Sequence, residues 1–319
     1  MVWIWPLGSG FVIWSVRFAR EPDRVPLVSW GRGGSARKGS CWKRAGRLIQ
    51  IGYAKRQGLG HPFDELLESL TVLQGADETR CELENRARPD VRREGRKGVP
   101  EVILAEGKPL DDVLEIAGRF IEDTGRALLS RVSEELLDRL RQSFPCHSME
   151  VYGGGRMVVV RSPDRPTART GGKIGIITAG TSDIPVAEEA RVLAQEMGCE
   201  VLTAFDVGVA GVHRVFQPLR AMLEAPVDAI IVVAGMDGAL PSVVAGLVDV
   251  PVIGLPTSTG YGLGGRGVAA LLSMLQTCSP GLTVVNIDNG VGAGATAALI
   301  ANRMAKLRAA TEAAGRAER

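Results

Sequence analysis

Five continuous apolar runs, separated by segments with a helical pattern, constrain the fold of the second half of this 319-residue chain. The apolar runs cover residues 173–180, 200–205, 229–235, 251–256 and 283–288, and the helical segments cover 185–197, 213–223, 241–247, 268–276 and 293–307. Strands that are apolar throughout are typical of a parallel sheet with helices on both faces. We therefore predict a doubly wound, flavodoxin-like α/β domain over residues 173–308, followed by a tail over 309–319.

A smaller α/β domain is predicted over residues 58–161, and a linker over 162–172 joins it to the larger one. Its predicted elements are helices over 62–73, 113–123 and 134–142, and strands over 99–104, 127–130 and 151–160. The last strand contains a bend at Gly153–Gly155.

Residues 1–57 differ from the rest of the chain in composition. They hold all five Trp, and their 11 Lys and Arg against 2 Asp and Glu give a net charge of +9. We expect a disordered leader or a mis-assigned start. A basic arm for nucleic acid is the alternative, although no motif organises its charges.

Composition excludes several classes of protein. Five Cys without a Cys-x-x-Cys pair are not a disulfide scaffold or a zinc site, and three scattered His are too few for a histidine-built metal centre. The net charge of +2 by itself predicts neither nucleic-acid nor membrane binding, and a membrane span is not expected near the start of the chain. We expect a cytoplasmic protein without nucleic-acid or membrane partners.

The loops that follow the five predicted strands are the candidate ligand site, because ligands bind beyond the carboxyl ends of parallel strands. These loops, rich in Gly, Ser, Thr and Asp, cover residues 178–183, 206–214, 234–241, 256–267 and 288–292. Glycines allow the backbone to approach a ligand closely, and helix N-termini attract anions. No Gly-x-Gly-x-x-Gly motif follows the first strand, so we expect no nicotinamide redox cofactor.

Two of these loops resemble those of the PurE-type aminoimidazole ribonucleotide carboxylases, namely Gly180–Asp183 and Ala234–Pro241. A wider set of segments resembles the LarB family. It comprises Val233–Val248, Pro256–Gly262, Leu275–Cys278 and Thr283–Gly290, together with the stretch from Asp90 to Lys108. The resemblance covers roughly residues 60 to 305, and one departure is Asp237, where the family has Glu.

The resemblance to the LarB family implies an activity. It is carboxylation of the pyridinium ring of nicotinic acid adenine dinucleotide at C5, with cleavage of the phosphoanhydride to release AMP. The other product is pyridinium-3,5-biscarboxylic acid mononucleotide, a precursor of the nickel-pincer nucleotide of lactate racemase. The resemblance also implies CO2 (from bicarbonate) as co-substrate, Mg2+ as cofactor, and a homo-oligomer, namely an octamer.

Carboxylation of a pyridinium ring requires a nucleophile, because this electron-poor ring cannot attack CO2 unaided. A thiolate that adds at C4 makes C5 nucleophilic and leaves afterwards. The family resemblance assigns this role to Cys278, which we expect at the carboxyl-side crevice of the sheet. The alternative for Cys278 is a buried apolar residue. Cys199 is in a helix-to-strand turn, at the opposite end of the sheet, and is expected to be structural.

The other candidate catalytic residues are Asp237, as a base or a Mg2+ ligand, and His213, which can exchange protons near neutral pH. The predicted substrate-binding residues lie in the same loops and are Thr181, Ser182, Asp183, Asp206, Arg214, Gly235, Met236, Gly238, Ala239, Thr257, Ser258, Tyr261 and Asn289. Arg93, Arg96 and Lys97 in the small domain are expected to form a solvated basic surface.

Two other functions stay open. The first is an aminoimidazole ribonucleotide carboxylase or mutase, which would tolerate loss of Cys278 because its substrate ring is electron-rich. The second is a nucleotide-binding module without turnover, in which Cys278 would react as an ordinary thiol.

Overall fold

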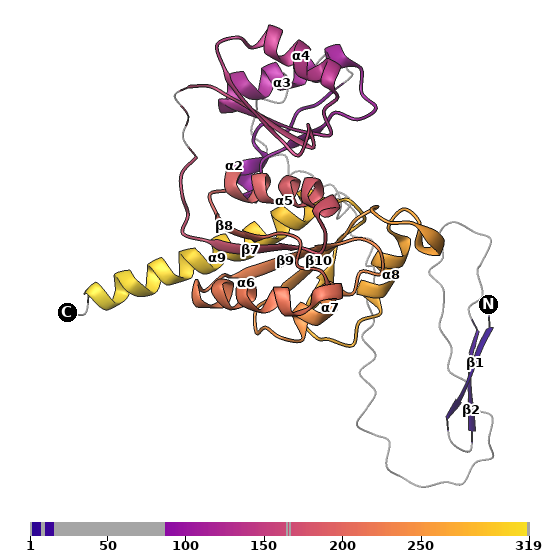
Figure 1. Cartoon of the computed structure of the whole chain (residues 1–319). Coiled ribbons are helices and arrows are strands. Elements are labelled where there is room, and N and C mark those ends of the chain that lie inside the picture. Colours follow the sequence, from indigo (N-terminus) through magenta and orange to yellow (C-terminus); the bar gives the residue numbers. More distant parts are fainter. Residues whose placement is uncertain (1, 8–9, 16–86, 164, 166, 318–319) are drawn as a thin grey trace, which may run out of the picture. The chain divides into compact units, whose positions relative to one another are not determined.

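The computed structural model describes residues 2–7, 10–15, 87–163, 165 and 167–317 (Figure 1). The helix predicted over 62–73 lies outside these residues. The chain divides into two units, Met1–His61 and Pro62–Arg319. In the first unit, β1 (Val2–Leu7) pairs antiparallel with β2 (Gly10–Ser15), within the segment predicted as a leader.

The second unit contains the predicted doubly wound domain, whose sheet is parallel throughout. Its strands are β7 (Lys173–Thr178), β8 (Glu200–Ala204), β9 (Ala229–Ala234), β10 (Val252–Pro256) and β11 (Leu282–Val284). Their order in the sheet is β11-β10-β9-β7-β8, which is the flavodoxin-like order and confirms the predicted fold class.

Helices cover both faces of this sheet, and this explains why its strands are apolar throughout. One apolar core joins α5 (Ile184–Glu196) and α9 (Gly290–Ala317) to Ile231 and Val233 of β9. The opposite core joins α6 (His213–Glu224), α7 (Leu240–Ala245) and α8 (Val268–Leu275) to Ile230 and Val232. Short 3-10 turns cover Thr181–Asp183, Val209–Gly211 and Gly262–Gly264. Among the described residues, no helix is long and apolar enough to cross a membrane.

The last helix departs from the prediction, which placed a tail from residue 309. Helix α9 instead continues to Ala317. Five of the nine residues 309–317 are Ala, which strongly favours helix, and no Pro interrupts them.

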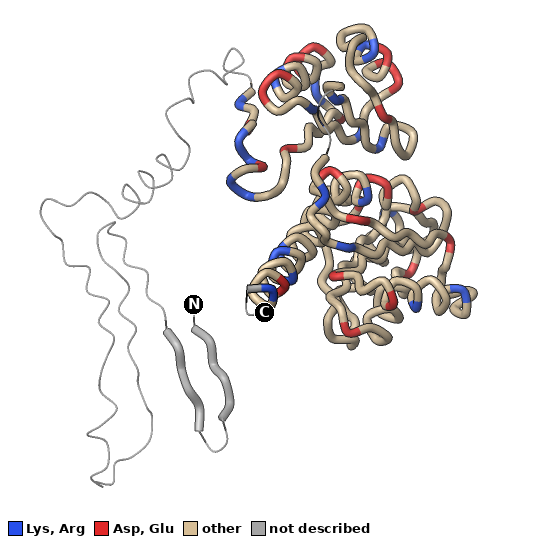
Figure 2. Tube along the Cα trace, turned by 90° about the vertical axis from the view of Figure 1, so that its left-hand side faces the viewer, with Lys and Arg blue, Asp and Glu red and all other residues tan. Residues whose placement is uncertain are grey.

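The small domain has a four-stranded sheet of order β3-β4-β6-β5. Its strands are β3 (Val102–Leu104), β4 (Arg126–Ser130), β5 (Ser148–Tyr152) and β6 (Met157–Arg161), and its helices are α2 (Arg93–Lys97), α3 (Leu110–Thr124) and α4 (Glu134–Ser143). Figure 2 shows acidic and basic residues interspersed along this domain and the larger one.

The single bent strand predicted over 151–160 is wrong, because the chain reverses there. Strands β5 and β6 pair antiparallel, with Tyr152 opposite Met157. The three glycines between them all have positive φ, of 56°, 65° and 92°, which β-strands do not adopt. The three consecutive glycines therefore form a turn rather than a bend.

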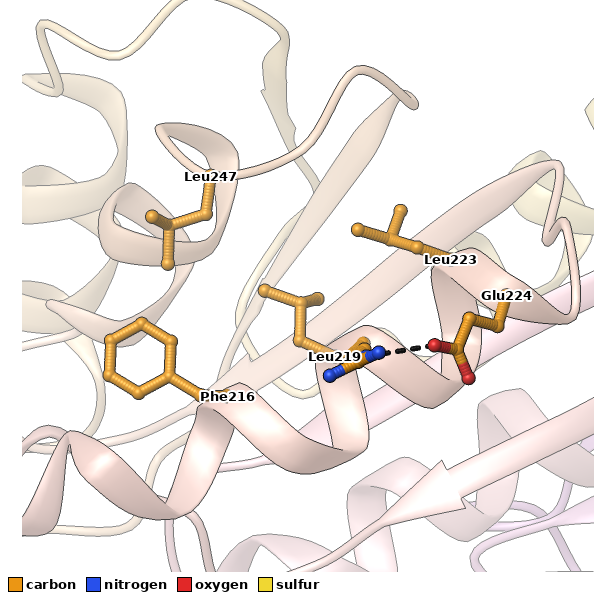
Figure 3. Close-up of a pocket in the computed structure, with 6 residues that line it drawn as sticks. Phe216, Leu219, Leu223, Glu224 and Leu247 are labelled. Carbon is orange, nitrogen blue, oxygen red and sulfur yellow. Dashed lines mark hydrogen bonds and ion pairs between the residues drawn. The ribbon is translucent and has the colours of Figure 1, made fainter.

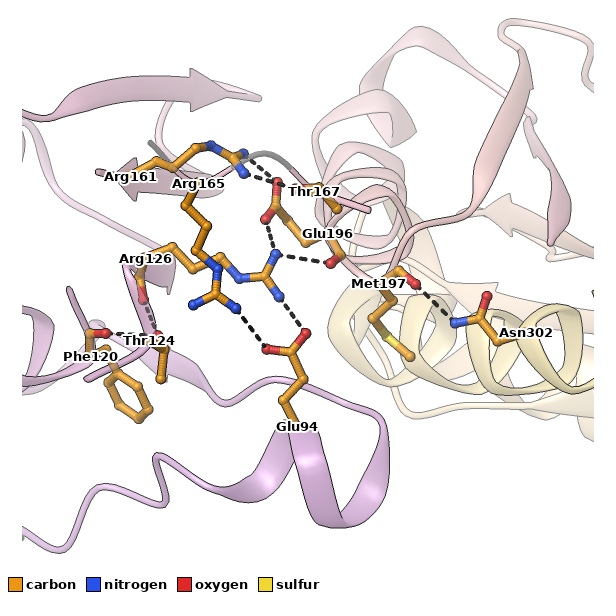
Figure 4. A network of polar contacts seen from close by, with 10 residues as sticks. All are labelled: Glu94, Phe120, Thr124, Arg126, Arg161, Arg165, Thr167, Glu196, Met197 and Asn302. Atoms are coloured by element: carbon orange, nitrogen blue, oxygen red, sulfur yellow. Dashed lines mark hydrogen bonds and ion pairs between the residues drawn. The ribbon is translucent and has the colours of Figure 1, made fainter. Parts of the chain in front are cut away.

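A buried ionic network joins the small domain to α5 (Figure 4). Arg126, which is 5% exposed, donates to the Glu196 carboxylate at 2.6 Å and to Glu94 at 2.7 Å. Arg161 donates to the other oxygen of the Glu196 carboxylate at 2.6 Å. Four charged groups thus hold β4 and β6 against the C-terminal end of α5.

We expect the substitution Arg126→Met to lower the free energy of unfolding by about 3–5 kcal/mol, because it leaves buried Glu196 short of one cation. Urea unfolding at a fixed protein concentration measures this effect. The matched control is Arg141→Met, which removes only an exposed ion pair with Asp138 and should change stability by less than about 0.5 kcal/mol. Equal losses from both variants would show that the network contributes nothing special.

Candidate functional site

The candidate site lies at the carboxyl ends of the parallel strands, where the strand order reverses between β7 and β9. The loop after β8 packs on the end of β7, since the Asp206 backbone N–H donates to Thr178 Oγ1 at 3.1 Å. The Val207 N–H donates to the Thr178 carbonyl, also at 3.1 Å. Loops after β9, β10 and β11 complete this surface, which we call the crevice.

Asp183 organises the floor of the crevice. Its side chain is buried, with the residue 3% exposed, and it accepts hydrogen bonds from Thr257 Oγ1 at 2.6 Å and from the Gly180 N–H at 2.9 Å. Burial raises the pKa of Asp183, and the hydrogen bonds from Thr257 and from the Gly180 and Gly235 backbone oppose that rise. Because Asp183 and Thr257 are both buried, they support the crevice from beneath.

Gly235 allows the loops after β9 and β10 to touch. A Cβ at this position would lie 2.3 Å from the Thr259 carbonyl oxygen and 2.7 Å from Thr257 Oγ1. The next residue, Met236, donates its backbone N–H to Thr259 O at 3.0 Å. Only glycine fits this approach, so the role of Gly235 is to let the two loops close on Asp183.

We expect Gly235→Ala to lower turnover by at least about 10-fold, because the added methyl group must push the loop after β10 away from Asp183. Overpacking of this kind should also lower the free energy of unfolding by roughly 1–3 kcal/mol. Steady-state kinetics and thermal melting measure the two effects. Gly265→Ala is the matched control, because its Cβ would meet only Gly262 O at 3.7 Å, an ordinary contact. Normal kinetics for Gly235→Ala would remove this glycine from the site.

Strained backbone concentrates around the crevice. Five non-glycine residues have a positive φ in the part of the chain that the structure describes. Four of them follow β8, β9, β10 and β11, and they are Asp206, Met236, Arg266 and Asp288. Such residues cost about 1–3 kcal/mol each and cluster at functional sites. The Asp288 carboxylate accepts from the Ser258 N–H at 2.9 Å and from its hydroxyl at 2.6 Å, which joins the last two loops.

The predicted residues after β8 form a separate exposed group beside β7. Arg214 donates to the Asp206 carbonyl at 2.7 Å and to its carboxylate at 3.2 Å. His213 is exposed at the first position of α6. Both side chains are therefore accessible to a ligand in the crevice.

The remaining predicted residues lie in the crevice loops with differing exposure. Thr181, Ser182, Met236, Tyr261 and Asn289 are exposed, while Gly238 is buried. Asn289 Oδ1 accepts from the Gly292 N–H at 2.8 Å and so caps α9. Ala239 precedes the first turn of α7.

Asp237 is exposed in the turn after β9, and among the described residues no hydrogen bond or ion pair holds its carboxylate. The described residues contain no group of three His, Cys, Asp or Glu that could hold a metal ion. Mg2+ in proteins is usually held by one or two carboxylates together with substrate phosphates and water, so a single carboxylate fits such a site once a phosphate substrate is bound. The exposed carboxylate of Asp237 therefore suits either of its two predicted roles, a base or a Mg2+ ligand.

The expected position of Cys278 is wrong. Cys278 is exposed, but it lies after α8 and before β11, at the amino end of the sheet. Neighbouring contacts locate it there, because the Gly281 carbonyl accepts from the N–H of Val252, the first residue of β10. The five residues of β10 span about 16 Å, so this thiol cannot reach the crevice of its own chain. Cys199 and Cys278 both lie in a connection from a helix to the next strand, and such connections lie at the amino end of a parallel sheet.

Cys199 is structural, as expected. It is buried, and its thiol lies 3.2 Å from Asn302 Oδ1. Burial raises the pKa of Cys199 to about 11, so the thiol is protonated and unreactive at neutral pH.

Three small-domain residues at the crevice were missed by the sequence analysis. Arg131 and Arg156 both donate to the Asp288 carbonyl at 3.3 Å, and Ser130 Oγ donates to the buried carboxylate of Glu189 on α5. Burial raises the pKa of Glu189. Glu189 could have been noticed in the sequence, because it is a Glu on the apolar face of a predicted helix. Nothing in the sequence distinguishes Arg131 and Arg156 from other surface arginines.

An apolar groove on α6 lies apart from these residues (Figure 3). It is lined by Phe216, Leu219, Leu223 and Leu247, and the ion pair between Arg220 and Glu224 borders it at 2.8 Å. None of the candidate site residues lines this groove.

Comparison with known proteins identifies both domains. Residues 81–162 match the LarB/PurE-like N-terminal domain, and residues 173–317 match AIR carboxylase. An uncharacterized protein of Methanocaldococcus jannaschii is 46% identical over 70% of this chain and 88% of its own length.

Two N5-carboxyaminoimidazole ribonucleotide mutases are also similar. The enzyme of Methanocaldococcus jannaschii is 35% identical over 40% of this chain and 75% of its own length. The enzyme of Thermotoga maritima is 31% identical over 40% of this chain and 74% of its own length. These similarities place the chain among carboxylase- and mutase-type enzymes.

Proposed function

Because this chain belongs to the LarB family, we propose that it carboxylates nicotinic acid adenine dinucleotide at C5 of the pyridinium ring and cleaves the phosphoanhydride. The products would be AMP and pyridinium-3,5-biscarboxylic acid mononucleotide, for nickel-pincer nucleotide synthesis. The observation that carries the proposal is the presence of both matched domains in one chain. The crevice of the second domain adds the buried carboxylate of Asp183 and several loops with strained backbone.

The carboxylation step follows from the electronics of the ring. A thiolate adds to C4, and the displaced electron pair moves onto the ring nitrogen, which gives a neutral dihydropyridine. Its C5 then forms a bond to CO2. A base removes the proton from C5, and expulsion of the thiolate restores the aromatic pyridinium. The exposed, unpaired carboxylate of Asp237 supplies this base.

Cleavage of the phosphoanhydride requires a water and a stabilised leaving phosphate. Arg214 is suited to hold a phosphate, because its guanidinium is exposed beside the crevice and already oriented by Asp206. His213 next to it can give a proton to the leaving group near neutral pH. We assign both residues to this half of the reaction.

The thiol must come from another copy of the chain, because Cys278 lies at the amino end of its own sheet. This makes the predicted homo-oligomer part of the mechanism. Three apolar side chains of α8 favour such an assembly, since Val268, Leu272 and Leu275 are 50%, 58% and 62% exposed at i, i+4 and i+7 spacing. An exposed apolar stripe of this kind is typical of a protein interface.

The second candidate function is that of the similar mutases, which are 31% and 35% identical to this chain over 40% of its length. Aminoimidazole is electron-rich, so such an enzyme would need neither the thiol nor the small domain. A nucleotide-binding module without turnover is the third possibility.

Incubation with nicotinic acid adenine dinucleotide, bicarbonate and Mg2+, followed by mass spectrometry, distinguishes the three. We expect AMP and the dicarboxylated mononucleotide in equal amounts. Conversion of N5-carboxyaminoimidazole ribonucleotide instead would favour the mutase, and binding without any product would favour the module.

A further inference from the structure

Two arginines of the small domain, Arg131 and Arg156, meet at the carboxyl-end edge of the large sheet. Arg131 directly follows β4, and Arg156 directly precedes β6. Both guanidinium groups donate to the backbone carbonyl of Asp288, each at 3.3 Å, and Arg131 also pairs through its other terminal nitrogen with exposed Glu106 at 2.7 Å. Asp288 belongs to the loop after β11 and holds Ser258, so the arginines border the crevice.

The backbone of the small domain holds this pair in place. The Arg131 N–H donates to the Arg156 carbonyl at 3.1 Å, and the Val132 N–H donates to the Gly155 carbonyl at 2.8 Å. Gly155 has a φ of 92°, and a Cβ there would lie 2.5 Å from Val132 O. Arg131 itself has a φ of 57° and is the fifth strained residue of the described chain. Two residues with strained backbone, Arg131 and Asp288, are therefore in direct contact.

The contacts with α5 orient the small domain so that this pair reaches the crevice. Arg126 at the start of β4 is bound to Glu196 at the last turn of α5. Ser130 at the end of β4 is bound to Glu189, nearer the start of that helix. Helix α5 begins directly after the crevice turn 181–183, so the end of β4 lies on the crevice side.

The hydrogen-bond donors of the Arg156 guanidinium are poorly satisfied in the structure. Its contact with the Asp288 carboxylate is 3.9 Å, and its Nε is buried with no hydrogen-bond partner among the described residues. Arg126, by contrast, reaches two carboxylates at 2.6 and 2.7 Å. The Arg156 side chain is 20% exposed, and its contacts with Asp288 are long, so its N–H groups remain able to donate to an anion.

We propose that Arg131 and Arg156 bind the second phosphate of a dinucleotide, and so select a dinucleotide over a mononucleotide. This inference rests on the proposed function. The mutases match only 40% of this chain, and a ribonucleotide carries one phosphate. A dinucleotide brings a second phosphate, and the small domain brings two more arginines to the same crevice. Guanidinium groups match phosphate oxygens in geometry as well as charge.

Calorimetric titration of the full-length protein and its variants tests the proposal with three probes: nicotinic acid adenine dinucleotide, ADP-ribose and nicotinic acid mononucleotide. ADP-ribose carries the diphosphate without the pyridine ring. We expect Arg131→Gln and Arg156→Gln each to weaken binding of the two diphosphate probes by at least about 10-fold, and to leave mononucleotide affinity unchanged. Arg139→Gln is the matched control, because within the described part of the chain Arg139 pairs with exposed Asp111 alone. Thermal melting checks that each variant folds.

The outcomes separate the two proposals. Equal weakening for mononucleotide and dinucleotide would overturn the inference, because the arginines would then act only through the Asp288 loop. Unchanged affinity for all probes would overturn it too. Weaker ADP-ribose binding in the variants, with no turnover by the unmodified protein, would retain the phosphate subsite and reject the proposed reaction.

Discussion

Replacement of Cys278 by Ser is expected to abolish carboxylation while leaving dinucleotide binding intact. A serine hydroxyl is not ionised at neutral pH and is a poor reversible donor to a pyridinium ring, whereas the proposed phosphate contacts come from other loops. Product formation by mass spectrometry and affinity by calorimetry measure the two properties. With substrate but without CO2, the unmodified protein should show a reversible dihydropyridine-like absorbance that the variant lacks.

Mixed oligomers test whether the thiol acts between copies. Cys278→Ser retains an intact crevice, and Asp237→Asn retains an intact thiol. If each site combines the crevice of one chain with the thiol of another, co-assembly of the two inactive variants in equal amounts should restore about a quarter of normal activity. Each variant assembled alone is the control. No recovery in verified mixed oligomers would place both groups in one chain, and full activity of Cys278→Ser would reject the thiol mechanism.

Asp237→Asn is expected to slow product formation by at least roughly 100-fold, a typical loss for a positioned base. The carboxylate is exposed, so the substitution should cost little stability. Single-turnover kinetics measure the rate of the chemical step directly. A dihydropyridine-like species should accumulate in this variant, because thiolate addition precedes the proton transfer.

The matched control for Asp237 is Asp138→Asn. Asp138 is also exposed, but it lies on α4 of the small domain, where it pairs with Arg141. Its substitution should leave the rate unchanged. A near-normal rate for Asp237→Asn would assign Asp237 to the geometry of its turn, whose preceding residue, Met236, has a φ of 51°.

The fold of the large domain was predictable because its determinants are local. Each strand is a short apolar run bounded by turn residues, and the burial of both faces of β9 shows why such runs do not alternate. The loops at the carboxyl ends followed from the rule for parallel sheets. The same rule should have placed Cys278 at the amino end, since it lies in a helix-to-strand connection, and its nearness to a strand in sequence was misleading.

What the amino-acid sequence determined by itself was therefore the order of strands and helices in the large domain, the loops at the carboxyl ends of its strands and the family. The tertiary structure alone decided how those loops combine. Thr257 meets Asp183 across 74 positions and Arg131 meets Asp288 across 157, and no local pattern encodes such pairs. The burial that raises the pKa of Asp183 likewise arises only when distant strands bring their loops together. Local propensities select the elements, whereas packing between distant segments builds the site.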